Sequence, residues 1–202
     1  TEQGLIVAWA PNVDSTHALV AANRSSANAS YRGLALSANG GGQVLYAADF
    51  YNARVDAFDA NFALLNLGGN AFVDPGMPAG YAPFGIQNIN GDIYVTYAKQ
   101  NADKDEEVAG VGNGYISVYS PNGKFLRRFA SRGYLNAPWG VAMAPAGFGS
   151  ARGTILVGNF GDGHINVFSK AGIFRGQLQD TSGNALEIDG LWSLARVSHR
   201  GL

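Results

Sequence analysis

Two short segments recur along the chain at a nearly constant spacing, and this repeat restricts the possible folds more than any other feature. One segment carries an aromatic residue at its sixth place and occurs four times without gaps, as GLIVAWAPN (4–12), ARVDAFDAN (53–61), GYISVYSPN (114–122) and GHINVFSKA (163–171). The other has glycine as its second residue, as RGLALSA (32–38), FGIQNIN (84–90), WGVAMAP (139–145) and DGLWSLA (189–195). The aromatic residues lie 49, 61 and 49 positions apart, and the glycines 52, 55 and 50 positions apart. Two independent segments with one period indicate a structural repeat.

Each repeat reads as four short strands. The pattern is clearest in residues 135–178, where apolar or alternating stretches at 139–145, 153–160, 164–168 and 173–178 are separated by turn residues. Strands of about 5–7 residues, grouped in fours and repeated every ~40–50 residues, are typical of the blades of a β-propeller. No stretch shows the apolar period of an amphipathic helix. The sequence therefore predicts an all-β fold, a β-propeller of four-stranded antiparallel blades.

The repeat divides the chain into about three to four blades of one partial propeller. Residues 4–26 supply only a third and a fourth strand, complete blades are expected at 31–67, 81–130 and 135–178, and residues 186–202 begin the next blade with a first strand at 189–197. These fifteen strands leave a seam with unpaired edges and an apolar face. We therefore expect further blades from the same protein, or edge-to-edge self-association in which residues 4–26 of one copy meet residues 189–197 of another.

The same register predicts which side chains form the core. The apolar positions of the inner strands should be buried between blades, namely Leu34, Leu36, Ile86, Val141, Ile155, Val157, Ile165 and Val167. The recurring glycines Gly33, Gly85, Gly140 and Gly190 should stand where strands crowd around the propeller axis, because a residue without Cβ lets backbones approach.

Composition and charge exclude several partners. The net charge is −1 and no basic stripe is present, so nucleic acid is not an expected partner. No apolar run is long enough for a membrane span. The chain has no cysteine, which removes disulfides, thiol catalysis and cysteine metal sites. It opens on Thr1 without a signal peptide, which suggests a processed or truncated chain.

The units resemble NHL-type six-bladed propellers. Residues 137–141, 154–160, 164–168 and 171–174 follow that repeat's order of elements, and Asp49, Asn52 and Arg54 match its Asp…Asn…Arg pattern, with Asn159 and His164 as departures in the third blade. More closely, the chain looks like the central part of an uncharacterised family of exported bacterial propeller proteins, some with a PEP-CTERM sorting tail, through residues 4–12, 31–36, 45–62, 82–85 and 189–192. The resemblance implies a six-bladed ring and a secreted or cell-surface location, and it adds no chemistry.

A candidate ligand site follows from the expected topology. In a propeller, the loops between second and third strands share one face with the loops that lead into the next blade, and ligands bind at the mouth of the central channel there. The candidate residues on that face are Asp49, Asn52, Arg54, Trp139, Asn159, Asp162, His164 and Trp192. Aromatic and polar side chains together suit a glycan, and a protein ligand is the other class considered. The simpler interpretation, preferred here, is that Asp49, Asn52 and Arg54 bond to turn backbone and to the neighbouring blade.

Metal sites are weakly indicated. Asp103, Asp105, Glu106 and Glu107 could bind calcium, but they lack the spacing of an EF-hand loop and include Lys104, so a solvated loop and no cofactor are expected. His17, His164 and His199 are not expected to converge on zinc. No carboxylate set for a calcium-dependent lactonase can be assembled around the axis, where Glu187 is the nearest glutamate.

Two functions remain open at this point. The first is an exported or cell-surface binding or scaffold module, with a glycan or a protein held at the loop face of the channel. The alternative is a propeller hydrolase or lyase with a metal at the channel mouth, for which no catalytic residue can be assigned. An axial cluster of carboxylates and histidines would favour the enzyme, and an aromatic-lined channel would favour binding.

Overall fold

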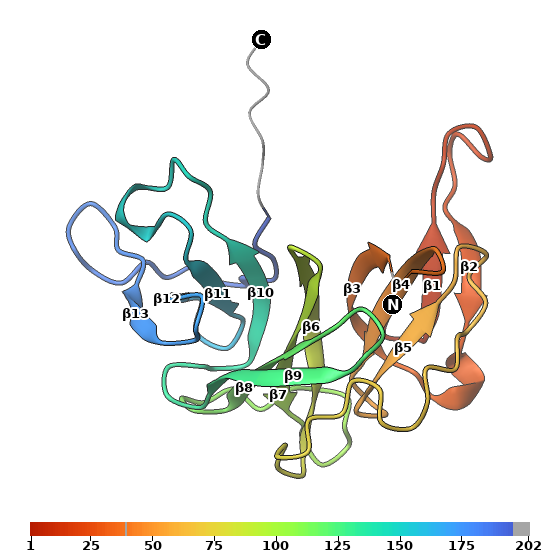
Figure 1. Cartoon of the computed structure of the whole chain (residues 1–202), viewed down its shortest axis with the longest axis horizontal. Coiled ribbons are helices and arrows are strands. Elements are labelled where there is room, and N and C mark those ends of the chain that lie inside the picture. Colours follow the sequence, from red (N-terminus) through yellow and green to blue (C-terminus); the bar gives the residue numbers. More distant parts are fainter. Residues whose placement is uncertain (39, 196–202) are drawn as a thin grey trace.

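The computed structural model describes residues 1–38 and 40–195 and shows only strands, turns and two short 3-10 segments in this part of the chain (Figure 1). Four antiparallel sheets follow one another along the sequence. They are β1 (Leu5–Ala8) with β2 (Leu19–Asn23); β3 (Tyr31–Ala38), β4 (Gln43–Asp49) and β5 (Arg54–Phe58); β6 (Tyr81–Ile89), β7 (Asp92–Lys99), β8 (Gly114–Tyr119) and β9 (Phe125–Ser131); and β10 (Pro138–Met143), β11 (Ile155–Asn159), β12 (Ile165–Phe168) and β13 (Phe174–Gln177). The 3-10 segments are Ser25–Ala27 and Gly149–Ala151.

The sheets are arranged as propeller blades. Within each sheet the strands pair in sequence order, and the first strands β3, β6 and β10 lie next to one another, so that β6 contacts both β3 and β10. Figure 1 shows the four sheets along an arc that is open at the top, with β10–β13 at one end and β1–β2 at the other. The predicted all-β fold of four-stranded antiparallel blades is confirmed. No helix in the described part of the chain has the length and apolar character to cross a membrane.

Crowding at the inner strands explains three of the four recurring glycines. A Cβ on Gly33 would lie 3.1 Å from the Phe84 carbonyl oxygen, and a Cβ on Gly85 would lie 2.1 Å from the Trp139 carbonyl oxygen. At Gly140 the nearest atom, 2.8 Å away, would be the Leu194 backbone nitrogen. A side chain at Gly85 or Gly140 would therefore require a shift of the neighbouring backbone, and Gly33 is at the limit of close contact, as the predicted crowding requires.

For the fourth glycine, Gly190, the prediction is wrong, because it does not stand at the crowded position of an inner strand. A Cβ on Gly190 would meet no atom within 4 Å, and its φ of +66° marks a turn glycine. The strand segment that Gly140 contacts is instead Ser193–Leu194. Trp192-Ser193-Leu194 is thus the equivalent of Trp139-Gly140-Val141, with a spacing of 53 from Gly140 to Ser193.

Two predicted strands are not formed, which leaves thirteen strands in the described residues instead of fifteen. Residues 62–67 make one bridge, between Phe58 and Leu64, and then cross to the next blade, where the Phe72 amide donates to the Gly123 carbonyl oxygen over 2.7 Å. Residues 189–195 carry no strand pairing, and residues 196–197 of this predicted strand lie outside the described part.

Asp74 anchors the crossing segment to its new neighbour. Its buried carboxylate accepts a hydrogen bond of 2.5 Å from the Ser117 hydroxyl and pairs with Arg128. Burial by itself would raise the pKa of Asp74, but the hydrogen bonds from Arg128, Ser117 and the Gly76 amide outweigh it and hold the pKa below its usual value. The segment that follows residues 62–67 therefore makes a contact between blades.

Six of the eight predicted core residues are buried, and they are Ile86, Val141, Ile155, Val157, Ile165 and Val167. The prediction is wrong for Leu34 and Leu36, which are 47% and 63% exposed. Both lie on the face of β3 that is turned toward the first sheet, opposite Ala47 and Leu45 of β4. That sheet has only β1 and β2. Its Ile6 packs in a cluster with Tyr31 and Ala47, and Leu34 and Leu36 remain uncovered.

Candidate functional site: the mouth of the arc

Five aromatic side chains meet at the ends of the inner strands, and we call this group the aromatic mouth: Phe50, Phe84, Trp139, Phe160 and Trp192. Phe84, Trp139 and Trp192 each occupy the position just before the crowded residue of an inner strand, and Phe50 and Phe160 each follow a second strand, β4 and β11. Because these positions are equivalent in neighbouring blades, their side chains stand side by side. The aromatic mouth is therefore a consequence of the sequence repeat, which places these side chains at equivalent positions of adjacent blades.

Ring contacts connect the whole group. The Trp192 ring centroid lies 4.4 Å from that of Phe160, 5.9 Å from that of Trp139 and 6.0 Å from that of Phe84. Phe84 in turn lies 5.4 Å from Phe50. Phe50 and Phe84 are fully buried, whereas Trp192 is 41% exposed. The buried phenylalanines thus form the base of the group, and the Trp192 ring is accessible to solvent.

Arg32 occupies the same pre-glycine position on β3 and borders the aromatic mouth. Its guanidinium carbon lies 5.7 Å from the centroid of Phe50, and its carbonyl oxygen accepts a hydrogen bond of 3.1 Å from the Trp139 indole. The guanidinium bonds to Glu2 and to the Asp105 carbonyl oxygen, which leaves the side chain only 5% exposed. Its Nε has no partner.

Glu107 supplies a second buried polar atom without a partner, its Oε2. Burial raises the pKa of this carboxyl, the Glu106 charge adds to the rise, and the Arg32 charge opposes it. A cleft of about 490 Å³ opens beside Arg32, lined also by Glu2, Ser30, Tyr51, Asp105 and Glu106. Arg32 Nε and Glu107 Oε2 are therefore a buried donor and a buried acceptor without a protein partner close to this cleft.

Asp49, Asn52 and Arg54 are brought together, but by bonds that stabilise the fold. Buried Asp49 accepts from the Ser30 amide over 3.0 Å and from the Asn52 side chain over 2.8 Å, and Asn52 also donates to the Ala27 carbonyl oxygen. Burial raises the pKa of Asp49 in spite of these bonds. Arg54 pairs with Asp56 at 2.8 Å and lies 3.5 Å from Asp49. Asp49 and Asn52 thus bond to backbone, as the simpler interpretation predicts, whereas Arg54 pairs with acidic side chains of its own blade.

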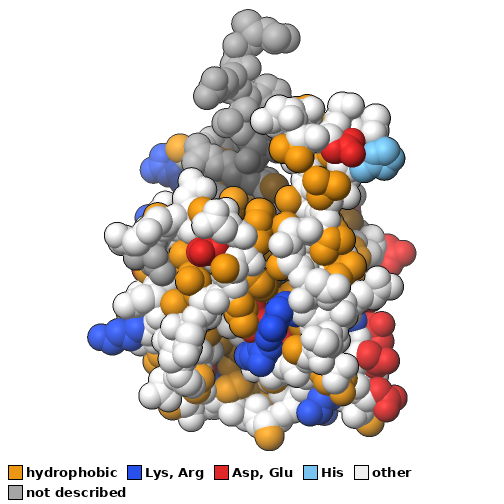
Figure 2. Space-filling view, turned by 90° about the vertical axis from the view of Figure 1, so that its right-hand side faces the viewer, with side chains coloured by type: hydrophobic (Ala, Val, Ile, Leu, Met, Phe, Trp, Pro, Cys, Tyr) orange, Lys and Arg blue, Asp and Glu red, His pale blue; other side chains and the backbone are white. Residues whose placement is uncertain are grey.

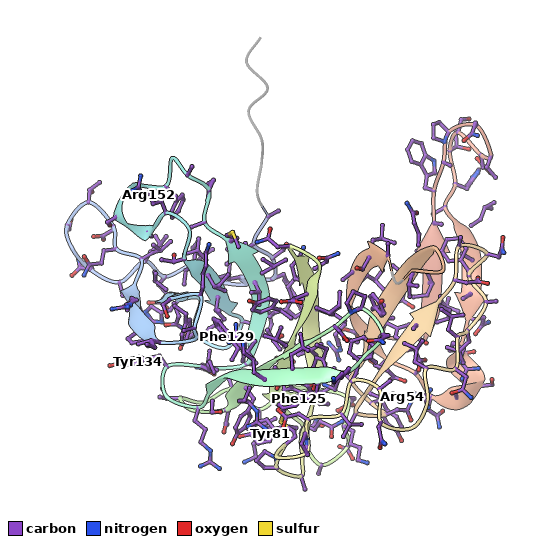
Figure 3. The ribbon with its side chains drawn as sticks, in the orientation of Figure 1. Arg54, Tyr81, Phe125, Phe129, Tyr134 and Arg152 are labelled. Carbon is purple, nitrogen blue, oxygen red and sulfur yellow. The ribbon has the colours of Figure 1, made fainter. Side chains whose placement is uncertain are left out.

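Asn159, Asp162 and His164 form a separate group in the last blade. Asn159 donates to the Tyr134 carbonyl oxygen over 2.8 Å, and Asp162 accepts from the His164 amide over 3.1 Å. Figure 3 shows Arg54 and Tyr134 toward opposite ends of the arc, so the two polar groups do not share a site. Of the predicted site residues, only Trp139 and Trp192 belong to the aromatic mouth.

The acidic loop is a tight turn built around Asn101. Asp105 accepts from the Asn101 side chain over 2.7 Å, Glu106 lies 3.9 Å from Arg32, and Asp103 is exposed. Across residues 1–38 and 40–195, no three histidine or acidic side chains form a group that could hold a metal. His17 pairs with Asp14, His164 with Asp162, and His199 lies outside the described residues.

Calcium is expected to leave the thermal stability unchanged. Ligands that bind the native state raise its melting temperature by mass action, and the carboxylates of the loop do not form a metal-holding group in the described residues. Differential scanning calorimetry with added calcium and then with a chelator checks this expectation. A reproducible rise in melting temperature with calcium would show that Asp103, Asp105, Glu106 and Glu107 do bind it.

Sequence reasoning missed Arg32, Phe50, Phe84, Glu107 and Phe160. One signal could have found part of this set, because the residue just before each recurring glycine is large or charged in every copy. Phe50 and Phe160 follow strands of apolar sequence and are indistinguishable there from ordinary core residues.

No protein-family model matches the chain. Two uncharacterised proteins of Acanthamoeba polyphaga mimivirus are 38% and 40% identical to it over 202 residues. The alignments cover 98% and 96% of this chain but 37% and 52% of the two relatives. The chain thus spans about half or less of the length of the curated relatives that it matches.

One solved structure shows the same architecture. It is a candidate gluconolactonase with 16% sequence identity and a TM-score of 0.60, covering 87% of this chain and 57% of its own. The chain is a β-propeller. The propeller part of the expected resemblance is thereby confirmed, whereas a six-bladed ring and export stay predictions.

Proposed function

We propose that this propeller is a binding module that holds a glycan at its aromatic mouth. The observation that carries the proposal is the open face of Trp192, 41% exposed, over a floor of Phe160, Trp139 and Phe84 rings. Sugar rings present flat apolar faces that stack on indole, and a ring held rigidly by its neighbours loses little entropy on binding.

The polar part of the proposed recognition lies at the cleft beside Arg32, which borders the aromatic mouth. Sugar hydroxyls both donate and accept hydrogen bonds. Arg32 Nε offers a donor and Glu107 Oε2 an acceptor, each buried and without a protein partner. Both atoms are closed to solvent, so a ligand reaches them only if the side chains around the cleft move. Such a ligand gains affinity and specificity, because leaving buried polar groups unpaired is costly. In keeping with the resemblance to exported propellers, we place this module outside the cell or at its surface.

The alternative function is a hydrolase or lyase acting at the same mouth. It has in its favour the fold that the chain shares with a candidate gluconolactonase. An enzyme would change the bound compound, whereas a binding module would release it intact. Mass spectrometry of the ligand before and after incubation separates the two.

A glycan array tests the proposal with matched tryptophan variants. Trp192→Ala is expected to weaken binding at least about tenfold, which corresponds to ~1.4 kcal/mol, because the stacking face is lost. Trp9→Ala is the control, since Trp9 directly follows β1, is 58% exposed and lies outside the mouth. Absence of glycan binding, or equal loss in both variants, would contradict the proposal, and capture of a protein in its place would reassign the ligand class.

A further inference from the structure

The outer edge of β5 is open over residues 54–56. Residues 62–67 meet β5 only near its end, where the Leu65 amide donates to the Ala57 carbonyl oxygen over 2.8 Å. The amide and carbonyl groups of a strand residue point to one edge, and this edge alternates along the strand, so those of Val55 point the same way as those of Ala57. Within residues 1–38 and 40–195, the outward amide and carbonyl groups of Val55 have no hydrogen-bond partner.

The next two blades close the same edge with their own chain. β8 pairs with β9 along residues 115–119, and β12 pairs with β13 along residues 166–168. At β5 the chain leaves the edge instead and crosses to the next blade, where the Phe72 amide bonds to Gly123. The outer edge of a blade points away from the blades beside it, so the open edge of β5 is a local feature of this blade.

A cleft of about 350 Å³ runs along the open edge. Residues 54–57 of β5 all line it, and consecutive side chains of a strand point to opposite faces, so the strand edge itself borders the cleft. Leu64 and Val73, which are 44% and 47% exposed, line it as well. Figure 2 looks at the end of the arc that holds β1, β2 and β5, and shows basic side chains beside hydrophobic ones in the middle of this face.

The two faces of this edge differ in chemistry. On one face Val55 and Leu67 belong to an apolar cluster. On the other face Asp56 pairs with Arg54 at 2.8 Å, and Arg24, which follows β2, lines the cleft. Arg24 forms no ion pair within the described residues, and its buried Nε has no hydrogen-bond partner. The cleft therefore holds one positive charge that no acidic side chain neutralises.

We propose that the open edge of β5 binds an extended peptide of a partner protein, which joins the sheet as a strand and places an acidic side chain beside Arg24. An unpaired strand edge offers backbone donors and acceptors at the spacing that another extended backbone matches. Because side chains alternate between the faces of a strand, the peptide carries apolar residues on the Val55 side and acidic residues on the Arg24 side. The positive charge of Arg24 selects an acidic peptide over a basic one. No residue of the aromatic mouth lines this cleft, so the peptide site is separate from the proposed glycan site.

Fluorescence anisotropy with two synthetic peptides tests this site. Both are labelled octapeptides, one in which glutamate alternates with valine and one in which lysine alternates with valine. The glutamate peptide is expected to bind saturably, at least about tenfold more tightly than the lysine peptide. No saturable binding of the glutamate peptide, or equal binding of both peptides, would overturn the proposal.

Two substitutions separate strand addition from general charge attraction. Val55→Pro removes the outward amide hydrogen and leaves the bonds between β5 and β4, and it should weaken binding of the glutamate peptide at least about tenfold. Arg24→Glu should weaken the glutamate peptide by a similar factor and strengthen the lysine peptide, a gain that an unfolded variant would not show. Arg152→Glu is the control for charge, because Arg152 is exposed and Figure 3 shows it at the opposite end of the arc from Arg54.

Other occupants of the edge give different results. Unchanged binding of the glutamate peptide to Arg24→Glu, or the same loss in Arg152→Glu, would overturn the proposal even where Val55→Pro fails to fold. Self-association in sedimentation experiments that Arg24→Glu abolishes would overturn it in favour of a second copy of the chain. Failure of the glutamate peptide to bind the full polypeptide that the gene encodes would overturn it in favour of a segment of the same polypeptide.

Discussion

Gly85→Ala is expected to destabilise the fold by about 3 kcal/mol or more, at the upper end of overpacking effects. The added Cβ would lie 2.1 Å from the Trp139 carbonyl oxygen and 2.8 Å from the Thr96 hydroxyl. Neither β6 nor β10 can move without disturbing its own sheet. The free energy of unfolding in urea measures the effect, and a failure to fold is the stronger form of the same result.

Gly147→Ala is the matched control. A Cβ there meets no atom within 4 Å, and the backbone has no positive φ, so the change should be neutral or slightly stabilising. If Gly85→Ala were as stable as Gly147→Ala, the inner strands could not be as close as the structure shows.

Ile155→Ala should cost about 2–5 kcal/mol, the range for large cavities in a core that cannot collapse. Ile155 is fully buried on β11, in the cluster that joins the last two blades through Ile116 and Val118. Thermal and urea unfolding give the measurement.

Ile173→Ala in the same blade serves as the comparison. Ile173 is 58% exposed, so its truncation should change the unfolding free energy by less than about 0.5 kcal/mol. Equal melting temperatures for Ile155→Ala and the parent chain would show that the strand register is wrong.

The fold could be predicted from the sequence because steric crowding between the inner strands selects glycine, and these glycines recur visibly along the sequence. Gly33, Gly85 and Gly140 stand where a Cβ would be crowded by the next inner strand, and they mark the first strands of their blades. The register predicted from Gly190 was wrong, because a turn with positive φ also selects glycine. The crowded position of that segment is occupied by Ser193. The error in Leu34 and Leu36 has another origin, since their pattern is that of a core strand and only the neighbouring sheet decides whether they are covered.

The site was predicted in part. Trp139 and Trp192 were identified because the expected topology places them on the face shared by the loops that lead into each blade. The polar candidates share the expected loops, yet their bonds to Ser30, Ala27 and Tyr134 are internal to the fold. Arg32 could not be recognised, because its burial depends on Glu2 and on the acidic loop, which is more than seventy positions away along the chain.

Fluorine NMR of the chain labelled with 5-fluorotryptophan tests binding at the aromatic mouth most directly. The sequence has three tryptophans, so Trp9, Trp139 and Trp192 give three resonances that single substitutions assign. On titration with the glycan selected by the array, the account predicts saturable shifts of the Trp139 and Trp192 resonances and none of Trp9. Binding with a shift of Trp9 alone, or with all three resonances unmoved, would contradict it.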